Sequence, residues 1–252
     1  MRRGMLAALA AVTLGLSACG MLDKEAQYRV AARELATDMT AMNASDGEHF
    51  PAINPASAAT GEAGQFSHNF KNFLIKVIGD RKGYHAEMEA LRFSEVTAPS
   101  ALTSSEGLAR AQGAVTQAKA ITTKYRALNA QRLADIRREM TAIAPGSAVI
   151  RAFLHGFDSS MGSGGGVMAQ VSDDELRIFD EYGRPLDDLG HARGRWRPEG
   201  SIIMFSNNAD ADAFNGHMRT IQSAAMDERT LVATQQTLQR QRVDQMNNLA
   251  KP

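Results

Sequence analysis

The sequence predicts a mainly α protein: an elongated helical bundle of long amphipathic helices with a small irregular insert, in which a short β-hairpin is one alternative. Apolar residues recur every three or four positions over several long stretches, which is the spacing of one helix face. Aromatic residues make up only 6% of the 252 residues while Ala, Met and Gln are plentiful, and this composition favours helix over sheet. A hydrophobic content of 44% and a charged content of 22% are typical of a folded chain with a sizeable core.

Charge and cysteine content exclude several classes of function. The 28 basic and 28 acidic side chains balance, whereas nucleic-acid-binding proteins usually carry a basic excess, so we expect no nucleic-acid partner. The chain has a single cysteine, Cys19, which rules out an internal disulfide framework.

The first residues have the organisation of a secretory signal. Arg2 and Arg3 precede an uncharged, mostly apolar run from Met5 to Leu16, which is too short to span a bilayer core of about 30 Å as a helix. The run ends in Leu16-Ser17-Ala18-Cys19, which resembles the lipobox of bacterial lipoproteins. Two alternatives stay open. An ordinary signal cut after Ala18 has Leu16 where a small residue is expected, and a core helix would begin with two arginines.

The resemblance to bacterial lipoproteins implies a modified N-terminus. In that family the cysteine thiol is diacylglycerylated, the preceding peptide is removed and the new amino group is acylated. Residues 1–18 would then be the signal peptide, residues 19–23 the acylated tether, and Cys19 the site of the membrane anchor. Several acyl chains, palmitate among them, anchor a protein stably without a transmembrane helix. Gly20 implies sorting to the cell outer membrane, because an Asp there commonly means retention at the inner membrane, and we expect the body to face the periplasm.

The body begins with two predicted helices. Residues 24–43 carry an apolar stripe at helical spacing, and residues 44–64 form a loop rich in Gly and Pro. Residues 65–95 return to helical spacing. Gly79 and Gly83 weaken this second helix by about 1 kcal/mol each relative to Ala and predict a kink or break.

A third, very long helix follows. Thr103-Ser104-Ser105-Glu106 has the pattern of a capping box, and the apolar spacing continues from there to about Ile143, a length of roughly 60 Å at the helical rise. Pro145-Gly146 ends this helix, and residues 147–157 predict a short buried one. These elements make residues 24–161 the first part of the bundle.

Residues 162–206 differ in composition from the rest of the chain. The glycines at 162–166 predict a flexible hinge, and further glycines and prolines predict an irregular insert after it. Leu176–Phe179 and Ile202–Phe205 are candidate strands of a hairpin, although the first segment is equally compatible with a helical turn. Residues 207–252 form a long C-terminal helix that completes the bundle.

Two short segments carry a second resemblance. The opening Cys19-Gly20-Met21-Leu22-Asp23-Lys24-Glu25 and the Ile202–Phe205 block leading to Phe214-Asn215, together with the long polar helices, resemble an uncharacterised family of helical bacterial lipoproteins of unknown function. The resemblance implies a helical fold over most of the chain and supplies no catalytic residues.

Known catalytic and cofactor motifs are incomplete in this sequence. The glycines at 162–166 are followed by Val167-Met168 instead of the Lys and Ser or Thr of a phosphate-binding loop, and Val167 also breaks a dinucleotide motif. Asn208-x-Asp210-x-Asp212 has the spacing of a calcium loop but lacks the Gly and the final Glu of that loop. The six histidines contain no His-x-x-x-His pair. We therefore predict no cofactor and no metal, and favour a protein that is not an enzyme; an enzyme with a dispersed site is a further alternative.

One basic-aromatic cluster stands out, consisting of Arg193, Arg195, Trp196 and Arg197. Arginine binds phosphate or carboxylate in bidentate geometry, and tryptophan offers a flat surface to a sugar or ring. The cluster predicts that residues 167–206 bind an anionic envelope ligand, either a lipid phosphate or the cell wall. The alternative is a surface turn in which the tryptophan covers the bundle and the arginines pair with Asp187 and Asp188.

Two functions are therefore expected. The first is an acyl-anchored envelope lipoprotein whose periplasmic helical body acts as a non-enzymatic adaptor, scaffold or envelope-maintenance protein, with an envelope protein or the cell wall as partner. The second is a binding module for the anionic ligand. The sequence does not specify an oligomeric state.

Overall fold

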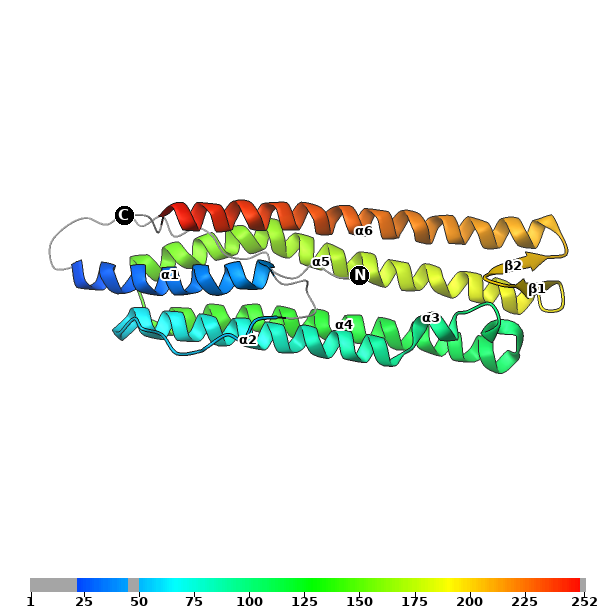
Figure 1. The fold of residues 1–252 in the computed structure, drawn as a ribbon, viewed down its shortest axis with the longest axis horizontal. Coiled ribbons are helices and arrows are strands. Elements are labelled where there is room, and N and C mark those ends of the chain that lie inside the picture. The colour runs from blue at the N-terminus through cyan, green and yellow to red at the C-terminus, as the bar shows by residue number, and fades with distance from the viewer. Residues whose placement is uncertain (1–21, 45–49, 250–252) are drawn as a thin grey trace. The chain divides into compact units, whose positions relative to one another are not determined.

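The computed structural model of the chain describes residues 22–44 and 50–249 (Figure 1). Within these ranges the chain forms six α-helices, one short 3₁₀-helix (η1) and one two-stranded antiparallel sheet. This confirms the prediction of a mainly α helical bundle with a small β-hairpin. Cys19 and the lipobox lie outside the described residues.

The helices of the first half of the chain follow the predicted segments. α1 spans Leu22–Ala44, α2 spans Gly61–Ala90 and α4 spans Ser105–Ile143, with the short α3 (Phe93–Val96) and η1 (Ala101–Thr103) between α2 and α4. None of the helices in the described part of the chain combines the length and the apolar character that crossing a membrane requires.

α2 is continuous through its two glycines, so the predicted kink or break is wrong. At Gly83 the missing side chain has a packing role, because a Cβ there would lie 2.4 Å from the hydroxyl oxygen of Tyr125. Packing of the apolar face of α2 outweighs the propensity cost of about 1 kcal/mol for each glycine.

The chain divides into two compact units. Unit 1 comprises residues 1–81, 127–169 and 231–252, and unit 2 comprises residues 82–126 and 170–230. Each of the helices α2, α4, α5 (Ala148–His191) and α6 (Asn208–Leu249) contributes one segment to each unit. The two units are described separately below.

The core of unit 1 is aromatic. α2 contributes Phe66, Phe70 and Phe73, whose spacing places them on one helix face, and α5 contributes Phe153 and Phe157. The rings of Phe66 and Phe153 meet edge to face with their centroids 4.7 Å apart. Truncation of such a buried ring to Ala typically costs about 3–5 kcal/mol, so this cluster is a main source of the stability of unit 1.

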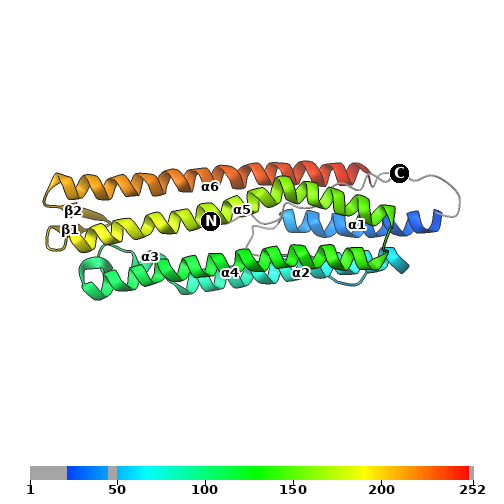
Figure 2. The same ribbon diagram turned by 180° about the vertical axis from the view of Figure 1, so that it is seen from behind.

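The core of unit 2 holds the hairpin in place. β1 (Trp196–Glu199) and β2 (Ile202–Phe205) pair in antiparallel register, with Trp196 opposite Phe205. Gly200 has a φ of 62° at the first position of the two-residue turn, which is the pattern of a II′ hairpin turn. Trp196, Ile203 and Phe205 pack against a buried cluster built from η1, α4 and α5. In both views the hairpin lies between the end of α5 and the start of α6 (Figures 1 and 2).

Polar side chains cap the helices next to the hairpin. The N–H of Gly107 donates to Oγ of Ser104 at 3.0 Å, so Ser104 caps α4 one residue later than the predicted capping box places it. Thr103 cannot cap α4 because it is the last residue of η1. η1 also places the carbonyl oxygen of Ala101 close to α4, so a Cβ at Gly107 would lie 1.7 Å from that oxygen. α6 is capped by Asn207, whose Oδ1 accepts a hydrogen bond from the N–H of Asp210 at 2.9 Å.

The segment from 162 to 191 corrects the sequence interpretation. Its glycines at 162–166 have helical backbone instead of forming a joint, and Leu176–Phe179 is helix instead of strand, since both lie inside α5. Apolar residues at spacings of three and four, ending in Leu186 and Leu189, bury one face of this helix. That burial outweighs the cost of Pro185 inside the helix, which is about 3 kcal/mol. The irregular part is thus limited to the turns and the hairpin after His191.

Candidate functional site

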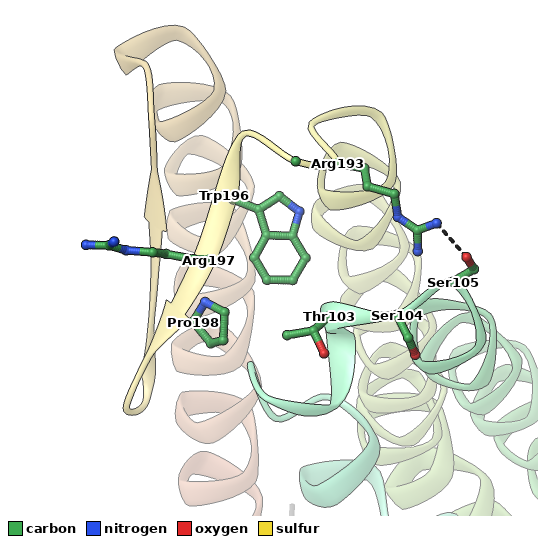
Figure 3. Close-up of a pocket in the computed structure, with 8 residues that line it drawn as sticks. Thr103, Ser104, Ser105, Arg193, Trp196, Arg197 and Pro198 are labelled. Carbon is green, nitrogen blue, oxygen red and sulfur yellow. Dashed lines mark hydrogen bonds between the residues drawn. The ribbon is translucent and has the colours of Figure 1, made fainter.

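A hollow in unit 2 is the first candidate for a binding site. It has a volume of about 530 Å³ and lies between strand β1 and the start of α4 (Figure 3). We call it the hairpin hollow and define it by the residues that line it: Thr103, Ser104, Ser105, Arg193, Gly194, Trp196, Arg197 and Pro198.

Arg193 provides the cationic group of the hairpin hollow. Its guanidinium donates a hydrogen bond to Oγ of Ser105, which lies 88 positions earlier in the chain (Figure 3). Among the described residues Arg193 has no carboxylate partner, whereas Arg195 does. The hydroxyl hydrogens of Ser104 and Ser105 are further donors at the same wall. The hollow therefore presents donors and one unpaired positive charge, which is a setting for an anion.

Trp196 forms a fixed wall of the hairpin hollow. Its indole N–H donates to the carbonyl oxygen of Leu189 at 2.9 Å, and its ring packs against the core of unit 2. Because the polar atom of the indole is already bonded, the ring offers a ligand only its apolar surface. This packing matches the alternative stated from the sequence, in which the tryptophan covers the bundle.

The other two arginines of the predicted cluster differ in their place. Arg195 does not line the hollow and binds both carboxylate oxygens of Asp210, at 2.8 and 3.1 Å, in the first turn of α6. Arg197 lines the hollow, but its side chain and that of Trp196 extend from opposite sides of β1, and its guanidinium lies 3.9 Å from Glu199 (Figure 3). The structure thus brings Arg193, Trp196 and Arg197 of the four together at the hollow.

The predicted partners of the arginines are corrected by these contacts. Asp187 accepts a hydrogen bond from Gln112 at 2.7 Å, and Asp188 faces His217 at 3.6 Å. Asp210 takes the place of both as the partner of Arg195, because the hairpin returns the chain to the start of α6 beside the end of α5.

Sequence reasoning missed the other wall of the hairpin hollow. Thr103, Ser104 and Ser105 are distant from the hairpin in sequence, and their capping pattern signals only the start of a helix. Only the fold shows that this helix start faces Arg193.

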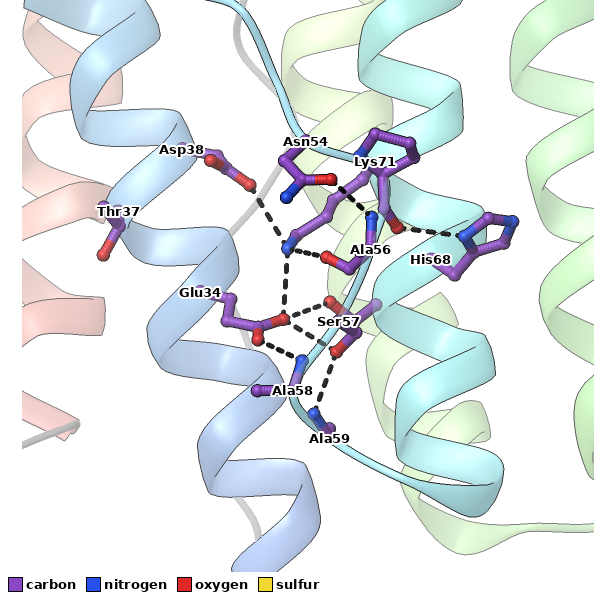
Figure 4. Close-up of polar contacts among 12 residues, drawn as sticks. Glu34, Thr37, Asp38, Asn54, Ala56, Ser57, Ala58, Ala59, His68 and Lys71 are labelled. Carbon is purple, nitrogen blue, oxygen red and sulfur yellow. Dashed lines mark hydrogen bonds and ion pairs between the residues drawn. The ribbon is translucent and has the colours of Figure 1, made fainter.

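A second polar cluster lies in unit 1, where it joins α1, α2 and the loop at 50–60 (Figure 4). The carboxylate of Glu34 accepts hydrogen bonds from the backbone N–H of Ala58 at 2.6 Å, from Ser57 at 2.7 Å and from Lys71 at 3.1 Å. Lys71 is buried and also donates to the carbonyl oxygen of Ala56 at 2.7 Å.

The protonation of this cluster follows from its donors. Burial by itself raises the pKa of Glu34, but the hydrogen bonds from Ala58, Ser57, Ser67 and Lys71 outweigh it and lower the pKa to about 2. A carboxylate held ionised by this many donors is a poor proton acceptor at neutral pH. We therefore interpret the cluster as a structural fastening of the loop and not as a reactive site.

In the described ranges no three His, Cys, Asp or Glu side chains are arranged to hold a metal ion. Comparison of the chain with models of known protein families, with curated proteins and with solved structures found no significant match. The two resemblances stated from the sequence therefore stay predictions.

Proposed function

We propose that the protein is an acyl-anchored lipoprotein of the bacterial outer membrane, with a periplasmic helical body that acts as a non-enzymatic adaptor or scaffold. The observation that carries the proposal is the tetrapeptide Leu16-Ser17-Ala18-Cys19, which follows an apolar run with two preceding arginines and contains the only cysteine of the chain. A mainly α body with long helices is compatible with a scaffold role.

Metabolic labelling tests the anchor. Cells that make the wild-type protein are expected to incorporate radiolabelled palmitate into it, and cells that make Cys19→Ala are not, because the acceptor thiol is gone. Thr13→Ser is a matched control in the apolar run that keeps the lipobox and is expected to keep the label. Label on Cys19→Ala, or its absence from the wild type, contradicts the proposal.

Membrane fractionation tests the address. The wild-type protein is expected in the outer-membrane fraction, and Gly20→Asp is expected to move it to the inner-membrane fraction. Gly20→Ser is the control that leaves the address unchanged. A wild-type protein in the inner-membrane fraction would contradict the proposed location without affecting the proposal of acylation.

A second function, recognition of an anionic envelope ligand, is favoured by one observation. Arg193 faces the hairpin hollow without a carboxylate partner among the described residues, beside the fixed ring of Trp196. An arginine that lacks a protein anion and sits beside an apolar wall suits a phosphate or carboxylate carried on a larger group.

Co-sedimentation distinguishes the two sources of such an anion. The probes are purified cell wall and vesicles of phosphatidylglycerol, with vesicles of phosphatidylcholine as the reference without net charge. Arg193→Gln is expected to reduce retention at least tenfold, whereas Arg219→Gln, at an exposed arginine of α6 that does not line the hollow, retains the wild-type value. Equal retention of both variants and the wild type would contradict recognition by the hollow.

A further inference from the structure

The packing of α6 on α5 in unit 2 combines apolar side chains with buried polar groups. The contact consists of the α5 segment 170–191 and the α6 segment 208–230, and we call it the α5–α6 seam. Its apolar cluster has three buried members, Ile178, Ile221 and Ala224, with partly buried neighbours around them, and Phe214 of α6 packs against the neighbouring cluster. Polar groups lie at the two ends of the cluster, where their burial affects the stability of the seam.

At one end His217 of α6 lies between two carboxylates of α5. Nδ1 of His217 is 3.9 Å from Oε2 of Glu181, and Nε2 is 3.6 Å from Oδ2 of Asp188. Both of these oxygens are buried and accept no hydrogen bond. Buried acceptors without a donor are destabilising by about 1–3 kcal/mol each, so this end of the seam is weakly held by its polar groups.

Two glutamates are buried at the other end of the apolar cluster. Glu175 of α5 and Glu228 of α6 are 9% and 6% exposed, and neither has an ion-pair partner among the described residues. The hydroxyl of Tyr84 in α2 donates to Oε2 of Glu175 at 3.0 Å, and the hydroxyl of Thr122 in α4 is 3.5 Å from that of Tyr84. Two buried carboxylates with a single neutral donor are stable only if at least one of them is protonated.

The protonation of the glutamates follows from this setting. Burial first, and then the nearby charge of Glu228, raise the pKa of Glu175 to about 7. Burial raises the pKa of Glu228 as well, while Asp174 adds to the rise and Arg229 opposes it. Burial raises the pKa of Tyr84 too, so its hydroxyl keeps its proton.

Several of the other charged groups around the seam are paired with one another. Arg177 contacts Asp174 at 3.1 Å and Asp227 at 3.7 Å, and Arg184 contacts the other carboxylate oxygen of Glu181 at 3.3 Å. The other ion pairs around these helices are Arg126 with Asp173, Lys119 with Asp180, and Lys124 with Glu87. On α2, His85 lies against the ring of Tyr84, with the two centroids 5.7 Å apart. These pairs leave no described lysine or arginine in an ion pair with Glu175 or Glu228.

We propose that the α5–α6 seam is a proton-operated latch, in which a proton taken up at the Glu175–Glu228 pair closes α6 onto α5 and its release opens it. The pair is buried between the two helices, so its charge acts directly on their packing.

The direction of the pH dependence follows from Glu175. Its carboxyl group binds a proton more tightly in the closed seam than in the open chain, where the ordinary value is 4.5. The closed seam is therefore favoured at low pH, is weakened as the pH rises from about 4.5 to about 7, and stays weaker above that. The equilibrium between closed and open α6 is expected to shift on the order of 100-fold across this range.

Hydrogen exchange of the backbone amides of residues 210–230 measures this equilibrium in the full-length protein. After correction for the intrinsic effect of pH on exchange, the wild-type protein is expected to be on the order of 100-fold better protected at pH 5 than at pH 8. Glu175→Gln mimics the protonated acid and is expected to keep the pH 5 protection at pH 8.

A gain of protection at pH 8 in Glu175→Gln separates a latch from simple damage to the fold, which would lower protection at every pH. Glu199→Gln, an exposed carboxyl group on the hairpin, is the control and is expected to behave like the wild type. If Glu175→Gln does not fold, Glu228→Gln carries the same expectation. Equal wild-type protection at pH 5 and pH 8, or an unchanged pH dependence in a folded Glu→Gln variant, would overturn the proposal.

A metal cation bound by Glu175 and Glu228 is the alternative to a proton as the group that neutralises this pair. Exchange at pH 8 is therefore repeated with millimolar calcium chloride and with magnesium chloride. Under the proposal neither salt restores protection. Restoration in the wild-type protein but not in Glu175→Gln would replace the proton with a metal ion and overturn the latch.

Discussion

Two carboxylates, one in each unit, have opposite surroundings. In unit 1 the half-buried Glu34 is surrounded by donors, among them the buried ammonium group of Lys71, and its pKa is lowered to about 2 (Figure 4). In unit 2 the buried Glu175 has one neutral donor, Tyr84, and a second carboxyl group nearby, and its pKa is raised to about 7. At Glu34 the donors outweigh burial, whereas at Glu175 burial and the neighbouring charge outweigh the single donor.

The difference has a structural consequence. The unit 1 cluster holds a loop to two helices and is stable over the whole neutral range, because its carboxylate is always ionised and always bonded. The unit 2 pair lies between two helices and changes its protonation near neutral pH. The first is a fastening, and the second is suited to a switch.

Lys71→Met is expected to have the largest effect, because it removes the cation from a pair of carboxylates in unit 1. The pair would then resemble Glu175 and Glu228 of unit 2. The variant leaves Glu34 and Asp38 without their cation, and loss of one partner from such a pair is expected to cost about 3 kcal/mol of unfolding free energy. Urea unfolding measures it. Lys76→Met, whose exposed partner Glu139 is 3.8 Å away, is the control and is expected to cost less than about 1 kcal/mol. Equal losses in the two variants would contradict the special role of Lys71.

Acid is expected to have the next largest effect, and it acts on unit 1 in the direction opposite to unit 2. The stability that Glu34 contributes is fully present above its ordinary value of 4.5 and is lost as the pH falls through about 2. The amide proton of Ala58, which donates to Glu34, reports this directly by NMR. An amide signal of Ala58 that loses its hydrogen-bonded shift between pH 5 and pH 4 would contradict the low pKa.

Ser67→Ala is expected to have a moderate effect. It removes one donor, at 2.9 Å from Glu34, and leaves the others in place. The cost is expected to be about 1 kcal/mol of unfolding free energy, together with a small rise in the pKa of Glu34. Ser105→Ala in unit 2, which removes an exposed hydroxyl, serves as the reference with no effect on that pKa. A pKa of Glu34 that does not rise would mean that Ser67 is not one of its effective donors.

Tyr84→Phe is expected to have the smallest effect on stability and a specific effect on protonation. It removes the hydroxyl that donates to Glu175, so the ionised form loses its one donor and the pKa of Glu175 moves further upward. The midpoint of the pH-dependent exchange of α6 is expected to move to higher pH with it. A midpoint that moves downward would show that the hydroxyl does not stabilise the carboxylate.

Local sequence signals were sufficient for much of the fold. The apolar spacing predicts α1, α2 and α4, Pro145-Gly146 marks the end of α4, and Ile202–Phe205 forms a strand as predicted. These features depend on residues that are near one another in the chain. α5 was not predicted at its full length, because its glycines and Pro185 are local helix-breaking signals, while the burial that overrides them comes from residues distant in sequence.

The candidate sites were less accessible to sequence reasoning for the same reason. The basic-aromatic cluster predicted Arg193 and Trp196 at one place, but the walls that they share with Ser104 and Ser105 exist only in the fold. Glu175 is brought to Tyr84, which lies 91 positions earlier in the chain, and to Glu228 by helix packing alone. No motif signals two glutamates on different helices as a pair.

Titration of the glutamate side chains by ¹³C NMR, in the same sample of the full-length protein, tests the contrast between the two units most directly. Glu34 is expected to stay ionised down to a pH of about 2, and Glu175 is expected to take up its proton at a pH of about 7. If both carboxyl groups titrate together near 4.5, the ordinary value, their surroundings do not set their charge, and both the fastening and the latch are contradicted.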